Sequence, residues 1–184
     1  HLFKWSKEAF CQQLNGRTIL FIGDSTMQQS AATVMNAVHG TCADSISYAL
    51  SDTLLGLDFG VMNRGVTWGK AVAQINPDLV ILTVGAHVND TRSFEYILGQ
   101  VLNDTSLYPD KKVIWKTQNP GGCSMDMQDF LDPESGNKPS QFDPLEYHHQ
   151  DFYNRDKLAI EFFNGTDVSI LDMRPLYLRT DAHP

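Results

Sequence analysis

Apolar residues along this chain fall into short uninterrupted runs and longer periodic stretches. A short apolar run that ends at glycine or a polar residue is typical of a strand buried on both faces of a sheet. Such runs predict strands at residues 17–23, 77–85, 111–117 and 168–173. We expect the middle region, residues 41–70, to add another strand, with "FGVMNRG" (59–65) as its candidate.

The longer stretches carry apolar residues at helical spacing and predict helices at residues 25–40, 93–104 and 144–165. The first and the last of these end at glycine, which is a common helix stop. Residues 118–143 are rich in Gly, Pro, Ser and Asp, so we expect a long irregular loop there.

Strands that alternate with helices and are apolar throughout favour a parallel sheet covered on both faces. We therefore predict an α/β fold, a three-layer α/β/α sandwich around a central parallel sheet. Residues 1–184 are expected to form a single domain. Because the chain begins at His1 rather than at methionine and stops at Pro184, we expect this domain to be cut at both ends.

The charge balance restricts the partners. The net charge of −8 provides no basic field to attract phosphate, which argues against nucleic acid and anionic membranes. No apolar run approaches the roughly 18 residues of a membrane span, so we expect membrane attachment only through a segment outside this chain. Neutral substrates such as sugars are compatible with this composition.

Cysteines and glycosylation sequons bear on the compartment. The three cysteines form no C-x-x-C pair, which argues against a zinc knuckle, and at least one is unpaired within this chain: Cys11, Cys42 and Cys123. Three N-x-[ST] tripeptides begin at Asn89, Asn103 and Asn164. Together the sequons favour a secretory or extracellular setting, and the alternative is a cytosolic protein with buried thiols.

Ser25 follows the first predicted strand, in "FIGDSTMQQ". A serine at such a turn has its hydroxyl at a helix N-terminus, where N–H groups and the helix dipole favour negative charge. This position suits a nucleophile whose oxyanion uses the Ser25 N–H. It equally suits a plain helix cap.

A nucleophilic serine needs a base, usually a histidine oriented by a carboxylate. Asp181 and His183 lie beyond the last predicted strand, where the chain can fold back beside the first turn. The alternative for this pair is a solvated loop. Oxyanion donors are expected at Gly65 and at His87 or Asn89, although Gly65 also suits a turn with positive φ and Asn89 a glycosylated surface.

Trp68 follows Gly65 and either stacks on a sugar face beside the site or belongs to the core. We assign no metal and no cofactor. Adjacent His148 and His149 point to different faces of a helix. The acidic residues of the predicted loop lack the Gly and Glu of an EF-hand.

Three segments together resemble a known family: "LNGRTILFIGDSTMQQ", "VIWKTQNPGGC" and "ILDMRPLYLRTDAHP". They are similar to the SGNH (GDSL) hydrolase superfamily, and closer to its PC-esterase branch, which includes the trichome birefringence-like O-acetyltransferases. The resemblance implies a flavodoxin-like SGNH sandwich in which Ser25 accepts an acetyl group as a covalent ester. It also implies that Gly23 and Asp24 present Ser25, and that Gly65 belongs to the oxyanion hole.

The resemblance leaves some positions open. The family's G-x-N spacing falls on His87, whereas Asn89 matches by identity. Gln28 stands where the plant members have Arg, and we expect Asp24, Gln28 and Gln29 to contact substrate.

The superfamily's base lies in D-x-x-H, whereas this chain has D-x-H. Plant members carry a later "DC-x-HWC" block, so the base is either the Asp181 and His183 pair or lies beyond Pro184. Cys123 resembles a family cysteine that pairs downstream.

The expected function is therefore acetyl transfer or ester hydrolysis on a carbohydrate through a Ser25 acyl-enzyme. The partners would be a carbohydrate or acetyl-ester substrate and, for a transferase, an acetyl donor. The resemblance and the sequons imply the Golgi lumen or the extracellular space. The alternative is a catalytically silent glycan-binding domain on the same fold.

Overall fold

The computed structural model of the protein describes residues 4–56, 64–88, 90–118 and 151–178. Five parallel strands form its sheet in the order β2-β1-β3-β4-β5. The strands are β1 (Ile19–Gly23), β2 (Ile46–Leu50), β3 (Leu79–Leu82), β4 (Lys112–Lys116) and β5 (Ser169–Leu171). The predicted parallel α/β class is confirmed.

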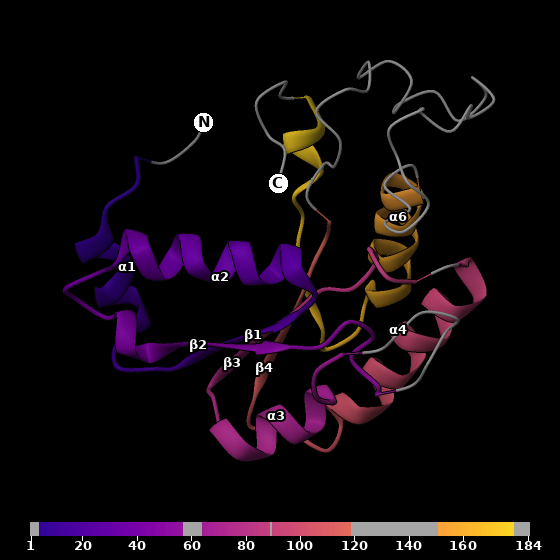
Figure 1. The fold of residues 1–184 in the computed structure, drawn as a ribbon, viewed down its shortest axis with the longest axis horizontal. Coiled ribbons are helices and arrows are strands. Elements are labelled where there is room, and N and C mark those ends of the chain that lie inside the picture. The colour runs from indigo at the N-terminus through magenta and orange to yellow at the C-terminus, as the bar shows by residue number, and fades with distance from the viewer. Residues whose placement is uncertain (1–3, 57–63, 89, 119–150, 179–184) are drawn as a thin grey trace.

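Helices lie on both faces of this sheet (Figure 1). They are α1 (Lys7–Leu14), α2 (Ser25–Ala37), α3 (Trp68–Ile75), α4 (Thr91–Thr105) and α6 (Phe152–Phe163), with short 3-10 turns η1 (Ala43–Ser45) and η3 (Arg174–Leu178). In Figure 1, α1 and α2 run above the sheet, and α3 lies below it. Helices α4 and α6 pack with α3 into the core on that second face.

Two hydrophobic clusters fill the space between the sheet and its helices. Phe21 and Ile81 of the strands pack with Met27 of α2 on the first face. Leu82 and Trp115 pack with residues of α3, α4 and α6 on the second. Because successive strand residues point to opposite faces, a strand covered on both faces is apolar at every position. This explains why the short apolar runs located the central strands.

The middle of the chain differs from the prediction. The strand contributed by residues 41–70 is Ile46–Leu50, not the candidate at 59–65, of which residues 59–63 lie outside the described residues. Helices α1 and α3 were not predicted. Helix α6 begins at Phe152, and the rest of the predicted 144–165 helix before residue 151 lies outside the described residues, as does the predicted loop beyond Gln118.

A disulfide joins Cys11 of α1 to Cys42, which directly precedes η1 (Cα–Cα 5.7 Å). It ties the first helix to the segment that leads into β2. Among the helices of the described ranges, none combines the length and the apolar character that crossing a bilayer requires.

Candidate functional site

The carboxyl ends of β1, β2 and β3 lie at the same edge of the sheet. Gly23 is in register with Leu50, and the Ser51 N–H donates to the Gly23 carbonyl (2.8 Å). On the other side, the Thr83 N–H donates to the Ile22 carbonyl (3.2 Å). The loops that follow these three strands therefore start side by side, with the turn after β1 in the middle.

The helix cap at this turn is Asp24, not Ser25. The buried Asp24 carboxylate accepts hydrogen bonds through Oδ1 from the Thr26 N–H (2.9 Å) and the Thr26 hydroxyl (2.7 Å). Ser25 is the first residue of α2 and is partly exposed. Within the described residues, the Ser25 hydroxyl forms no hydrogen bond. Asp24 thus performs the capping that the sequence allowed for Ser25.

Gly23 allows this turn to approach its neighbours closely. A Cβ at Gly23 would lie 2.6 Å from the Thr83 carbonyl oxygen and 2.8 Å from the Met27 Cβ. Real Cβ atoms do not tolerate such contacts with backbone and helix atoms. Glycine is therefore required for β1 to end between β3 and the first turn of α2.

Gly65 lies beside the end of β2. It forms an isolated antiparallel bridge with Ser51 and has φ +93°, a conformation that favours glycine. A Cβ there would overlap the Leu50 carbonyl group. The positive φ that the sequence allowed for Gly65 is present, and the turn brings Gly65 to the same edge as Ser25.

The loops after β2 and β3 contribute an ion pair that the sequence did not predict. Asp52 is fully buried, and its Oδ2 accepts from the Arg64 side chain (Nε, 2.9 Å) and the Arg64 N–H (3.1 Å). The other oxygen, Oδ1, lies 3.7 Å from Nε2 of His87. No local pattern marks Asp52, because its partners lie in two loops that only the fold brings together.

Tyr48 of β2 joins this pair to the Ser25 turn. Its hydroxyl lies 3.2 Å from the carbonyl oxygens of both Gly23 and Asp24. Burial, followed by the negative charges of Asp24 and Asp52, raises the pKa of Tyr48 to about 12. The phenol therefore stays neutral and donates a hydrogen bond at the start of α2.

A second buried group of polar residues, here called the Gln118 network, comprises Gln118, Arg155 and Asp156. Gln118 Nε2 donates to the Val84 carbonyl (2.6 Å), and the Gln118 N–H donates to Asp156 Oδ1 (2.9 Å). Arg155 Nη1 donates to the carbonyl of Gly85 (2.8 Å). These bonds hold the loop that carries His87 against β4 and α6.

Lys116, the last residue of β4, is 3% exposed. Burial lowers the pKa of its amine to about 8, although the charges of Asp156 and Asp24 oppose the shift. Its Nζ donates to the Thr117 carbonyl (3.2 Å). The amine is therefore within electrostatic reach of both the Gln118 network and the Asp24 cap.

The remaining predicted residues are placed as follows. Gln28 and Gln29 are exposed on α2, whereas Asp24 is buried by its capping role. Trp68 is 1% exposed and packs edge-on against Tyr108, which favours the core alternative over stacking on a sugar. Several predicted positions lie outside the described residues: Asn89, Cys123, His148, His149, Asp181 and His183.

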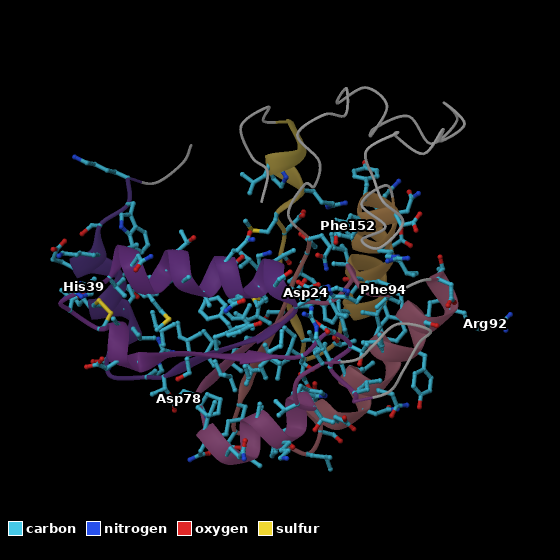
Figure 2. All side chains as sticks on the ribbon, viewed as in Figure 1. Asp24, His39, Asp78, Arg92, Phe94 and Phe152 are labelled. Carbon is cyan, nitrogen blue, oxygen red and sulfur yellow. A yellow bond between two sulfur atoms is a disulfide. The ribbon has the colours of Figure 1, made fainter. Side chains whose placement is uncertain are left out.

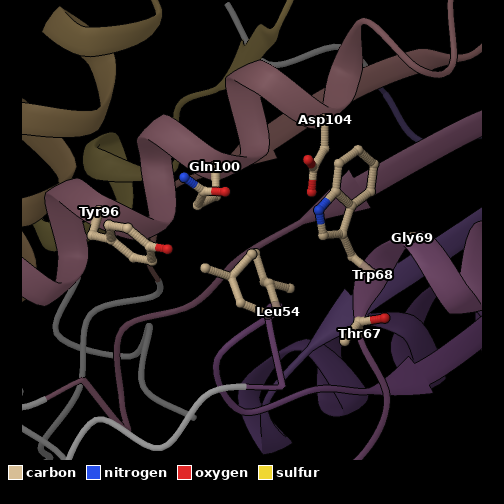
Figure 3. Close-up of a pocket in the computed structure, with 8 residues that line it drawn as sticks. Leu54, Thr67, Trp68, Gly69, Tyr96, Gln100 and Asp104 are labelled. Carbon is tan, nitrogen blue, oxygen red and sulfur yellow. The ribbon is translucent and has the colours of Figure 1, made fainter.

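A cavity of about 290 Å³ lies between the loop after Asp52 and helices α3 and α4 (Figure 3). Its wall combines apolar and polar side chains: Leu54, Leu55, Thr67, Trp68, Tyr96, Gln100 and Asp104, with Gly69. The buried indole N–H of Trp68 has no hydrogen-bond partner among the described residues and is turned toward Asp104 in Figure 3. Such a wall suits a small neutral polar molecule.

Across the described ranges, no three His, Cys, Asp or Glu side chains are grouped to hold a metal ion. The chain was also compared with protein-family models, curated proteins and solved structures, and none of them matched it.

Proposed function

We propose that the protein is an SGNH-type O-acetyltransferase or carbohydrate esterase with Ser25 as its nucleophile. The proposal rests on one observation at the β1–α2 turn: Asp24, and not Ser25, caps the helix. Asp24 caps the helix, so the partly exposed Ser25 hydroxyl is not engaged within the described part of the chain. A hydroxyl at a helix N-terminus, at the carboxyl edge of a parallel sheet, is well placed for acyl transfer.

In the proposed reaction, Ser25 Oγ attacks the carbonyl carbon of an acetyl ester and forms a tetrahedral oxyanion. The Ser25 N–H and the first turn of α2 favour the negative charge there. Gly65, and His87 or Asn89, are the other proposed donors, and Asp181 with His183 is the base pair that the resemblance suggests. The base takes the Ser25 proton, the C–O bond to the ester's alcohol breaks, and the alcohol leaves with that proton, which gives the acetyl-enzyme. A sugar hydroxyl or water then loses its proton to the base and attacks the acetyl carbon, which frees Ser25 and makes the enzyme a transferase or a hydrolase.

The strand order supports the proposal that this α/β fold is an SGNH-type sandwich. The order β2-β1-β3-β4-β5 is that of flavodoxin-like doubly wound sheets, the class to which an SGNH sandwich would belong. In such sheets, ligands bind outside the carboxyl ends of the strands at the point between β1 and β3 where the connections diverge. Ser25 follows one of these strands and His87 the other.

Three further observations support a glycan substrate in the secretory pathway. The Cys11–Cys42 disulfide suits an oxidising compartment, and the sequon residues Asn103 and Asn164 are exposed. The cavity beside Leu54 has the mixture of apolar and hydrogen-bonding groups that a sugar ring requires. We propose it as the place where the carbohydrate is held.

A serine-reactive fluorophosphonate probe tests the nucleophile. The wild-type protein should become labelled on the peptide that contains Ser25, and Ser25→Ala should abolish the label. Ser30→Ala is the matched control, because Ser30 lies on the same helix with its hydroxyl bonded to the Thr26 carbonyl (3.0 Å). Folded wild-type protein that stays unlabelled, beside a serine esterase that reacts, would favour the silent glycan-binding alternative.

A further inference from the structure

The cavity between the loop after Asp52 and helices α3 and α4 contains a buried hydrogen-bond donor without a partner. The Trp68 side chain is 1% exposed, and its indole N–H forms no hydrogen bond with the described residues. Such a donor is unfavourable, because it has lost its hydrogen bond to water. Trp68 lines the cavity, and Figure 3 shows its indole nitrogen turned toward Asp104 of α4. The N–H is therefore available to a molecule bound there.

Two polar side chains of α4 line the same cavity. Gln100 and Asp104 lie four residues apart, so they share one side of the helix. Within the described part of the chain, neither side chain forms a hydrogen bond or an ion pair. Asp104 stands in the last turn of α4, where the helix dipole disfavours a negative charge. The helix itself therefore gives no reason for a carboxylate at this position.

Leu54, which also lines the cavity, has an unusual backbone conformation. It is fully buried and has φ +62°, in the left-handed region that favours glycine. The backbone N–H of Trp68 donates to the Leu54 carbonyl (2.8 Å), which ties the two residues together. A strained backbone, an unpaired donor and a carboxylate at the unfavourable end of a helix thus meet at one cavity. Positions that depart from local preference in this way gather at functional sites.

The Trp68 and Asp104 side chains select the chemistry of a ligand. An indole N–H only donates a hydrogen bond, and a carboxylate only accepts one. A hydroxyl group satisfies both, because its oxygen accepts from Trp68 while its O–H donates to Asp104. A carbonyl or ether oxygen satisfies only the indole. Among the described residues that line the cavity none is cationic, and the Asp104 charge repels an acidic ligand.

The size of the cavity limits the ligand to a small one. Its volume of about 290 Å³ lies at the lower end of the roughly 300–1,000 Å³ typical of ligand pockets. This volume suits a single ring rather than a chain of several units.

We propose that the cavity is a subsite for one neutral sugar ring, with a ring hydroxyl bound between the Trp68 N–H and the Asp104 carboxylate. Gln100 bonds a second hydroxyl, and Leu54 and Leu55 contact the C–H groups of the ring. The inference rests on the proposed function and narrows its substrate to a carbohydrate with a neutral unit at this position.

The indole N–H gives a direct readout by NMR. The chain has three tryptophans, and the indole signal that disappears from the ¹H–¹⁵N spectrum of Trp68→Phe belongs to Trp68. The probes are the methyl glycosides of glucose, galactose, mannose and xylose, each added to the full chain. At least one should move the Trp68 signal downfield, because the N–H gains an acceptor, and should leave the other two indole signals in place. Methyl glucuronide at the same concentration should produce no shift.

Asp104→Asn tests the second group of the subsite and does not depend on the tryptophan variant. It keeps the shape of the side chain but removes the charge, so the Kd of the bound glycoside should rise roughly tenfold. Glu95→Gln is the matched control with unchanged Kd, because Glu95 is exposed on the same helix and does not line the cavity. Thermal melts show whether both variants are folded.

Two results would overturn the subsite. In the first, none of the four glycosides moves the Trp68 signal, so that water alone occupies the N–H. In the second, a folded Asp104→Asn binds as tightly as Glu95→Gln.

Fluorophosphonate labelling of Ser25 reports on the proposed function separately. A labelled Ser25 with no glycoside in the cavity would leave acyl transfer standing and remove only the subsite. A glycoside bound at Trp68 with an unlabelled Ser25 would support the subsite on a glycan-binding domain and contradict the proposed enzyme.

Discussion

Two polar groups lie at the same edge of the sheet and are built differently. The Gln118 network is buried, and its bonds to Val84, Asp156 and Gly85 measure 2.6–2.9 Å. The Asp52–His87 pair is looser, at 3.7 Å; Asp52 is fully buried, whereas the side chains of its two partners, His87 and Arg64, are 14% and 52% exposed. Both groups flank the loop between Thr83 and Val88.

The difference separates a tightly bonded scaffold from a loosely held ion pair. A buried network whose groups bond directly to backbone carbonyls fixes one loop conformation, and breaking it leaves desolvated groups unpaired. The Asp52–His87 contact, at 3.7 Å, is longer than a hydrogen bond and holds its loop less strongly. Variants of the Gln118 network should therefore change stability, whereas a variant of Ser25, whose hydroxyl no described residue bonds, should affect the proposed catalysis and not the folding.

The largest effect is expected for Ser25→Ala. Loss of the nucleophile should lower kcat for acetyl release by at least about 10³-fold, since the acyl-enzyme can no longer form. The free energy of unfolding should change by less than about 0.5 kcal/mol, because Asp24 supplies the helix cap and no described residue bonds the hydroxyl. Urea denaturation and steady-state kinetics measure the two quantities, and a large loss of stability would contradict this division of roles.

Arg155→Met should show the opposite behaviour. The guanidinium is buried and donates to the Gly85 carbonyl and to Asp151. Its removal leaves these acceptors without their donor and should lower the free energy of unfolding by about 3–5 kcal/mol. In urea denaturation, Arg92→Met should remain close to wild type, because Arg92 is exposed on α4 (Figure 2). If both variants lowered the free energy of unfolding equally, the Gln118 network would not be the structural element described here.

Lys116 gives the scaffold a pH dependence. The folded chain holds the Lys116 proton less tightly than the unfolded chain, since burial lowers its pKa from 10.5 to about 8. Burying the charged amine therefore lowers the free energy of unfolding by its full amount below about pH 8, and this destabilisation disappears as the pH rises toward 10.5. In Lys116→Met this contribution is absent. The difference in unfolding free energy between wild type and variant should therefore change by on the order of 3 kcal/mol over that range. A difference that does not vary with pH would show that the amine is not buried as described.

The central strands could be predicted well because a strand buried on both faces is a continuous apolar run in the sequence. β1, β3 and β4 are covered on both faces, so their apolar runs are continuous. β2, "ISYAL", lies at the edge of the sheet and is interrupted by polar residues, so the prediction placed the strand elsewhere. Because the predicted strand was residues 59–65 and not Ile46–Leu50, the sequence did not mark Asp52 as a residue at a strand end.

The site was predictable only in part for the same reason. Ser25 could be found because glycine, a capping residue and a helix pattern adjoin it in the sequence. The role of Asp24 as the cap depends on which backbone N–H its carboxylate reaches, and the sequence "GDS" permits either residue. The Asp52–His87 pair joins loops that β1 separates in the sheet, a relation that no spacing along the chain expresses.

The smallest effect on stability is expected for a polar pair outside both the Gln118 network and the Asp52–His87 pair. Arg174 and Asp172, which follow β5, form two parallel bonds (Nε–Oδ1 2.9 Å, Nη2–Oδ2 2.8 Å) but are both about one-third exposed. The hydrogen bond from Arg174 lowers the pKa of Asp172 below its ordinary 3.8, so any stabilisation is present above that pH and is lost as the pH falls further. Because solvent screens the pair, Arg174→Ala should cost no more than about 1 kcal/mol at neutral pH, and less in 1 M salt. Urea denaturation at both salt concentrations measures this cost. A cost equal to that of Arg155→Met would mean that burial does not distinguish the polar groups at this edge.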